Sequence, residues 1–158
     1  MDREQTPSGP APSVFRHIGC CFDGAPADDI AVRYAVGVAR DGSRLSLVHS
    51  TTTPIGDPLG GRPDDDRESA AAAWDSTLGK LAARIPGAAA VTLRGEPGPA
   101  ICRWAQEQGC DLIVVSARHP GPWGMSVLGG VTRHVLDNAP CPVLVVRASG
   151  TPDPAGRG

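Results

Sequence analysis

The chain has 158 residues, of which 20% are charged, and its formal net charge is −2. This length predicts one domain with a core of its own, and the near balance of charge argues against nucleic acid or an anionic membrane as a general partner. No apolar run approaches the roughly 20 residues that span a bilayer, and residues 1–14 lack the apolar segment of a signal peptide. We expect disordered tails at 1–14 and 148–158, rich in proline, serine and glycine, around a domain at 15–147.

Strand-like and helix-like segments alternate along the chain. The strands are expected at 17–22, 44–50, 90–94, 111–116 and 142–147. Helical periodicity is found at 26–40, 67–85, 99–108 and 127–138. The predicted inward positions of these helices are Ile30, Ala31, Tyr34, Ala35 and Val38, then Trp74, Leu78, Leu81 and Ile85, then Ile101, Trp104 and Ala105, and finally Leu128, Val131 and Val135. The alternation predicts an α/β fold, a doubly wound five-stranded parallel sheet with helices on both faces and right-handed crossovers.

Local signals mark the ends of these helices. Asp28 and Asp29 follow Pro26 in the first turn of the first helix, where the helix dipole favours acidic residues. The acidic run at 64–66 is interpreted as a solvated N-terminal cap of the second helix rather than as a metal site. Gly109 is expected to stop the third helix.

The five cysteines predict a reducing, cytoplasmic setting, because their number is odd and no CxxC pair is present. Cys20 and Cys21 should point to opposite faces of a strand. Cys102 and Cys110 are two helical turns apart, which is too far for a disulfide. We therefore interpret the cysteines as small buried hydrophobic residues.

The position of a ligand site follows from the predicted topology. In a doubly wound sheet, ligands bind outside the carboxyl ends of the strands, where the strand order reverses. The stretches after the first and fourth strands are FDGA at 22–25 and SARHP at 116–120. The second stretch contains His119, a residue type that titrates near neutral pH.

Four stretches carry a family resemblance: HIGCCFDGAPADDIAVRYAVGVA, LSLVHS, RGEPGPAICRWAQEQGCDLIVVSAR and VLGGVTRHVLDNAPCPVLVVR. In order and spacing they resemble the universal stress protein family, over about residues 15–147. The resemblance implies a five-stranded Rossmann-like α/β fold, a dimer, a cytoplasmic location and induction under stress. It also implies that some members bind ATP or AMP through G-x2-G-x9-G-(S/T), whereas others lack this motif and bind no nucleotide.

Only one of the four motif positions is kept in this chain. Gly129 matches the last glycine, and Gly130 replaces the Ser/Thr. Ser116 and His119 stand where the family has glycines. A phosphate cradle turns backbone N–H groups inward, and glycine reaches the positive φ angles involved more readily than serine or histidine. We therefore expect a degraded motif, in which Arg118 still offers a charge to phosphate.

The resemblance implies further residues around the same crevice. Asp23 matches an acid beside the nucleoside, Ser50 matches a residue near the base, and Gly95 belongs to a G-x-P turn. The candidate crevice consists of Asp23, Ser50, Gly95, Ser116, Arg118, His119, Gly129, Gly130, Val131 and Thr132. Alternatives remain for some of them, because Asp23 also suits a turn or helix-cap carboxylate, and the glycine pair suits a tightly packed helix start.

The sequence lacks the motifs of several enzyme classes. It has no GK pair for a P-loop, no G-x-S-x-G elbow and no HExxH spacing, and Lys80 is not placed as in a phosphoacceptor receiver. We expect no catalysis. The leading interpretation is a non-catalytic cytoplasmic stress-response protein that acts by homodimerisation and binding. The alternatives are an ATP- or AMP-binding sensor, with Mg, that uses the same crevice, and a weak ATP hydrolase.

The last predicted strand suggests a partner surface. If the family strand order holds, the apolar run PVLVVR lies at an edge of the sheet, where it invites pairing with another chain. The resemblance implies that two such strands join as a continuous antiparallel sheet. We expect a homodimer through Val143 and Val145, and the alternative is a core strand covered by the C-terminal tail.

Overall fold

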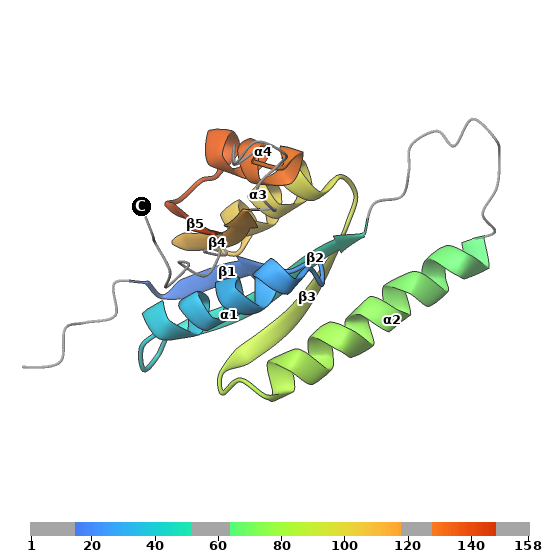
Figure 1. Ribbon diagram of the computed structural model, residues 1–158, viewed down its shortest axis with the longest axis horizontal. Coiled ribbons are helices and arrows are strands. Elements are labelled where there is room, and N and C mark those ends of the chain that lie inside the picture. The colour runs from blue at the N-terminus through green and yellow to red at the C-terminus, as the bar shows by residue number, and fades with distance from the viewer. Residues whose placement is uncertain (1–14, 52–63, 118–127, 148–158) are drawn as a thin grey trace, which may run out of the picture.

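The computed structural model describes residues 15–51, 64–117 and 128–147, and five strands alternate with four helices within them (Figure 1). The strands are β1 (His17–Cys21), β2 (Arg44–Thr51), β3 (Ala88–Arg94), β4 (Leu112–Ala117) and β5 (Val143–Arg147). The helices are α1 (Pro26–Val38), α2 (Asp64–Ala83), α3 (Pro97–Glu107) and α4 (Gly130–Asn138). The tails predicted at 1–14 and 148–158 lie outside the described residues.

The described strands form one parallel sheet in the order β3-β2-β1-β4-β5. The chain builds outward from β1 to β3 and then returns to the other side of β1 with β4. The strand order therefore reverses between β1 and β4, the position at which doubly wound sheets bind ligands. The predicted α/β fold is confirmed, and so is the place of β5 at an edge of the sheet.

Helices cover both faces of the sheet. One layer holds α1 and α2, and the other holds α3 and α4 (Figure 1). A strand can serve both layers because its consecutive side chains point to opposite faces. Cys20 packs in the α1–α2 layer and Cys21 against the α3–α4 layer, as predicted.

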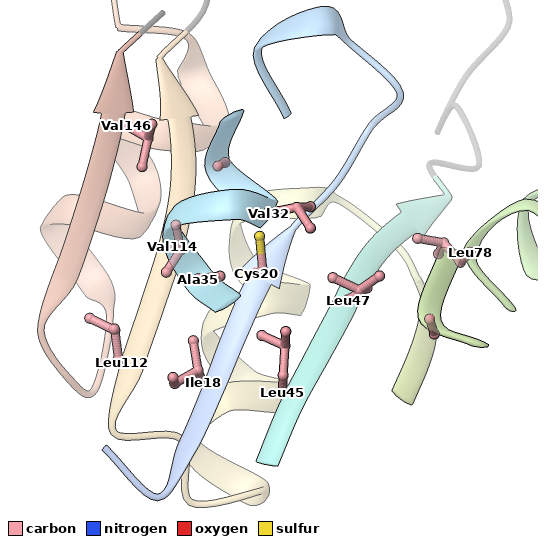
Figure 2. Packing of buried hydrophobic residues seen from close by; sticks show 12 residues of the cluster. Ile18, Cys20, Val32, Ala35, Leu45, Leu47, Leu78, Leu112, Val114 and Val146 are labelled. Atoms are coloured by element: carbon pink, nitrogen blue, oxygen red, sulfur yellow. The ribbon is translucent and has the colours of Figure 1, made fainter. Parts of the chain in front are cut away.

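The core beneath α1 and α2 joins side chains from four strands (Figure 2). Leu47 of β2 and Val114 of β4 are fully buried there, and Leu78 of α2 packs onto the same cluster. Truncation of a buried leucine such as Leu47 to alanine costs about 2–5 kcal/mol, because burial is lost and a cavity remains. All five cysteines are free, and three of them are buried, which agrees with their interpretation as hydrophobic residues.

Two predictions about the inward helix positions differ from the structure. The fourth helix begins at Gly130 rather than at 127, because Gly129 is extended, with φ −60° and ψ 157°, and acts as its N-cap. Leu128 therefore precedes the helix. The expectation that Tyr34 faces inward is wrong, since 56% of its surface is exposed. The buried stripe of α1 consists of Asp28, Ala31, Val32 and Ala35.

Other helix positions follow the sequence more closely. The inward prediction for Ile101, Trp104 and Ala105 is confirmed by their burial in α3. Gly109 follows that helix with φ +63°, a left-handed angle typical of a C-terminal stop. The acidic run at 64–66 forms the first turn of α2 rather than preceding it. Across the described ranges, no helix combines the length and apolarity needed to cross a membrane.

Candidate ligand-binding site

A cavity of about 230 Å³ lies at the carboxyl ends of β1, β2 and β4, beside the starts of α1, α3 and α4. It occupies the point where the strand order reverses. Its described lining residues are Cys21, Phe22, Asp23, Asp28, Val48, His49, Ser50, Pro97, Ile101, Val115, Ser116, Val131 and Thr132. Apolar walls with a few convergent polar groups are the usual composition of a small-molecule site.

The carboxylate of Asp28 organises the loop between β1 and α1. Asp28 is the third residue of α1, and only 2% of its surface is exposed. Its Oδ2 accepts hydrogen bonds from the backbone N–H of Asp23 at 2.8 Å and from that of Ala25, the N-cap residue, at 3.2 Å. This is the side-chain-to-cap half of a capping box, and it satisfies backbone donors that the start of a helix leaves open.

Asp28 is also linked to β4 and to a second carboxylate. Its Oδ1 accepts a hydrogen bond of 2.5 Å from the Ser116 hydroxyl. The Ala25 N–H donates to Asp23 Oδ1 at 3.0 Å as well as to Asp28, so one backbone donor lies between the two carboxylates. Burial raises the pKa of Asp28 above its ordinary value of 3.8, and a hydrogen bond with the Asp23 side chain raises it further.

Ser116 occupies the place of a motif glycine without any backbone strain. It lies inside β4 and pairs with Val146 of β5, so its backbone is extended. The expectation that serine at this position requires an unfavourable positive φ is therefore wrong. Its carbonyl accepts a hydrogen bond of 3.2 Å from the Thr132 hydroxyl, so Ser116 joins the end of β4 to both α1 and α4.

Ser50 and Gly95 lie on the β2–β3 side of the crevice. The Ser50 hydroxyl donates to the Gly95 carbonyl at 3.0 Å, and the Gly95 N–H donates to the Thr51 carbonyl at 3.1 Å. Gly95 has φ +114°, an angle that residues with a side chain rarely adopt, so glycine suits this turn into α3. Ser50 lines the cavity, whereas Gly95 is connected to it through Ser50.

An aromatic cluster flanks the cavity at β2. The Nδ1 of His49 lies 2.8 Å from the Phe22 carbonyl. Because a carbonyl can only accept, Nδ1 is the donor in this contact, and in the corresponding neutral tautomer Nε2 is an acceptor. The His49 ring stacks on Trp74 of α2, with centroids 4.0 Å apart and an interplanar angle of 22°. Trp74 also meets Phe22 edge-on at 6.5 Å.

The structure brings half of the predicted crevice residues together. The predicted residues that line the cavity are Asp23, Ser50, Ser116, Val131 and Thr132. Gly129 and Gly130 lie at the start of α4, next to Val131, and do not themselves line the cavity. Arg118 and His119 lie outside the described residues.

Eight of the thirteen described lining residues were missed by the sequence reasoning, among them the polar residues Asp28 and His49. Asp28 is indicated only as an acid near a helix N-terminus, although its spacing of three residues from Ala25 also fits a capping box. His49 is interpreted as a satisfied polar group, which agrees with its bond to Phe22, but its place in the cavity is not predicted. Among the residues that the structure describes, no three His, Cys, Asp or Glu side chains gather as a metal site.

Comparison with known proteins points to one family. The model of the universal stress protein family matches residues 15–147. A universal stress protein of Thermus aquaticus is 33% identical over 141 residues, which are 85% of this chain and 100% of that protein. The solved universal stress protein UspA from Lactobacillus plantarum has a TM-score of 0.67 at 24% identity and covers 83% of this chain and 97% of its own. A universal stress protein from Archaeoglobus fulgidus, solved in complex with dAMP, has a TM-score of 0.58 at 24% identity and covers 84% of this chain and 98% of its own.

Proposed function

Because this chain belongs to the universal stress protein family, we propose that it is a non-catalytic, homodimeric stress-response protein of the cytoplasm that binds a nucleoside-type ligand. The cavity at the carboxyl ends of β1, β2 and β4 carries the proposal. It combines the topological position of a ligand site with polar groups supplied by three different strands. The five free cysteines fit a reducing compartment.

The walls of the cavity suit a heterocycle with polar substituents. Val48, Ile101, Val115 and Val131 provide apolar surface, and Ser50 offers a hydroxyl oxygen near the end of β2. The cavity volume of about 230 Å³ is below the range of about 300–1,000 Å³ for drug-sized ligands. A nucleoside is therefore a better match than an entire nucleoside triphosphate. The Archaeoglobus fulgidus relative solved with dAMP supports a ligand of this class.

Several groups at the cavity argue for binding without catalysis. The Asp28 carboxylate already accepts three hydrogen bonds, which suits a structural cap more than a base that activates water. Burial raises the pKa of the Cys21 thiol well above its ordinary value, so the thiol stays protonated and is a weak nucleophile. We expect phosphate release from Mg·ATP to stay at the buffer background, and turnover that depends on protein concentration would contradict this.

The homodimer is supported by the edge position of β5. In the described sheet this strand pairs with β4 on one side only, and four of its five residues are apolar. An apolar edge strand without internal charges favours pairing with another chain. Val143 and Val145 lie on this strand.

A cavity-filling variant tests the ligand site. Val131 lines the cavity, and Val131→Phe should fill part of it and weaken adenosine binding at least tenfold in isothermal titration calorimetry. Leu136→Phe is the matched control, because Leu136 lies on the same helix, is 42% exposed and is not a lining residue. Unchanged affinity in the first variant, or no saturable binding to the wild-type protein at millimolar adenosine, would contradict the proposed function.

A further inference from the structure

His49 belongs both to the cavity and to the contact that holds α2 at the carboxyl end of the sheet. It lines the cavity at the end of β2, and only 9% of its surface is exposed. Its ring stacks on Trp74 of α2 with centroids 4.0 Å apart. Further along α2, Leu78 and Ala82 pack into the core beneath the helix, which lies beside β3 (Figure 1). Trp74 therefore connects α2 to the wall of the cavity.

The β1–α1 loop holds both rings of this stack in place. Nδ1 of His49 donates to the Phe22 carbonyl at 2.8 Å, and the Phe22 ring meets Trp74 edge-on at 6.5 Å. Gly24 has φ +85° and lies so close to the indole that a Cβ atom there would come within 2.8 Å of Cη2 of Trp74. Neither ring can turn away from the other without disturbing this loop, so a change of charge on His49 acts directly on the stack.

The second ring nitrogen of His49 is accessible to protons. Among the described residues, none forms a hydrogen bond with Nε2, and yet no buried side-chain nitrogen or oxygen lacks a partner there. Nε2 is therefore not fully buried, and the cavity that His49 lines gives it access to water. Histidine side chains ordinarily take up a proton near about pH 6.5, which turns the free ring nitrogen from an acceptor into a donor.

Aromatic and acidic groups surround this ring. A cation over the face of a tryptophan ring is attracted by its π electrons, and Trp74 presents such a face to His49. The lining residues that α3 and β4 contribute are Pro97, Ile101, Val115 and Ser116, which carry no charge. The titratable and charged groups on the other elements next to the end of β2 are Cys21 on β1, Asp23 in the loop, Asp28 on α1, Asp75 on α2 and Arg94 on β3.

From these contacts we propose that His49 is a proton-operated switch of the contact between the cavity wall and α2. Uptake of a proton converts the stack on Trp74 into a cation–π contact and makes the hydrogen bond to the Phe22 carbonyl a charge-assisted one. Acidification therefore holds α2 more tightly, and alkaline solution loosens it. The ligand of this switch is the proton, so the switch operates whether or not the cavity holds a nucleoside.

The test is hydrogen exchange of the α2 backbone amides in the full chain without added ligand, at pH 5.5 and pH 8, with intrinsic exchange rates divided out. The amide of Ile113 on β4 reports the stability of the whole sheet, so the protection of Leu78 and Leu81 is expressed relative to it. This relative protection should be about two- to fivefold higher at pH 5.5 than at pH 8. A value that is the same at both pH values, or lower at pH 5.5, overturns the proposal.

Two variants assign the effect to the imidazole. His49→Gln keeps an N–H donor for the Phe22 carbonyl but does not titrate, so its relative protection should be equal at the two pH values. His134→Gln is the matched control, because His134 lies on α4 and packs against Gly98 in the opposite layer, and this variant should keep the response. A response that persists in His49→Gln arises from other groups, such as Asp28, and overturns the role of His49.

A measurement on the wild-type protein does not depend on the folding of a variant. In nuclear magnetic resonance spectra recorded from pH 8 to pH 5.5, the indole N–H signal of Trp74 should move together with the ring nitrogen signals of His49. An indole signal that stays in place while His49 takes up its proton overturns the coupling. Failure of adenosine to bind would remove the proposed function and leave these results unchanged.

Discussion

The Ser116 hydroxyl donates a hydrogen bond of 2.5 Å to the Asp28 carboxylate, across 88 positions of the chain. This bond ties the end of β4 to the first turn of α1 at the point where the strand order reverses. Ser116 stands at a glycine of the nucleotide-binding motif. Its side chain therefore stabilises the crevice from within, where a glycine would leave room for a ligand.

Ser116→Ala should lower the free energy of unfolding by about 1–3 kcal/mol, because the buried Asp28 carboxylate loses a donor. The measurement is urea denaturation followed by circular dichroism. Thr77→Ala is the control, since Thr77 is exposed and its hydroxyl bonds only to the Ala73 carbonyl one turn earlier. Its effect should stay within about 0.5 kcal/mol. An equal loss of unfolding free energy in the two variants would contradict a stabilising role of the hydrogen bond between Ser116 and Asp28.

Asp28 predicts a specific dependence of stability on pH. Burial, followed by the hydrogen bond with Asp23, raises the pKa of Asp28 above 3.8 in the folded state. A carboxyl group whose pKa is higher in the folded than in the unfolded protein binds its proton more tightly in the folded protein. Its contribution to the free energy of unfolding is therefore fully present below the pKa of the unfolded state, and it is lost as pH rises through the pKa of the folded state. Asp28→Asn does not titrate, so the stability of the wild type relative to this variant should increase as pH falls from 7 towards 4. Urea denaturation of both proteins over this range measures the difference, and a constant or decreasing difference would contradict the prediction.

Gly24→Ala should disturb the wall formed by Trp74. Gly24 has φ +85°, and a Cβ atom there would lie 2.8 Å from Cη2 of Trp74, whose ring is held by its stacking on His49. We expect a loss of about 2–4 kcal/mol, which combines the cost of a positive φ with that of overpacking. Gly42→Ala is the control, because Gly42 has φ +89° and its Cβ would meet no described atom within 4 Å.

The control should lose only about 1–2 kcal/mol, the cost of the backbone angle alone. Thermal unfolding of both variants separates the cost of the positive φ angle from the cost of the contact with Trp74. If Gly42→Ala is as destabilising as Gly24→Ala, the contact with Trp74 is not a constraint on the loop.

Val145→Lys should convert the proposed homodimer to a monomer, because a charge on an edge strand opposes pairing with a second chain. Light scattering after size-exclusion chromatography measures the mass. Ala90→Lys on β3, the opposite edge of the described sheet, places the same charge at an exposed residue and should leave the dimer intact. A folded Val145→Lys dimer, verified by circular dichroism, would contradict dimerisation through β5.

The fold could be predicted because its signals are local. The apolar run of β4 is largely buried between two helical layers, and that of β5 is mostly half-buried at the edge of the sheet; both are continuous hydrophobic runs of the kind typical of parallel strands. The neighbours Cys20 and Cys21 enter opposite layers simply because strand side chains alternate. The first residue of a helix is harder to predict from sequence. The predicted start of the fourth helix at 127 is too early, because Gly129 is extended and Leu128 therefore lies before α4.

The site was harder to predict because its contacts are distant in sequence. Asp28 and Asp29 both suit the first turn of a helix, and only the position of Ser116 on a neighbouring strand determines that Asp28 is buried. The family motif has a glycine at the position of Ser116, and a motif glycine suggests a left-handed backbone, which serine adopts less readily than glycine. The strand continues to Ala117, however, so that requirement does not arise.

The most direct test of the crevice as a ligand site is a titration of the isotope-labelled protein with adenosine, followed by the backbone amide signals in nuclear magnetic resonance spectra. We predict that the signals of Ser50, Val131 and Thr132 shift with a single saturable dissociation constant, while those of Ala90 and Leu136 stay in place. Shifts confined to surfaces away from the cavity, or no shifts at saturating adenosine, would contradict the account.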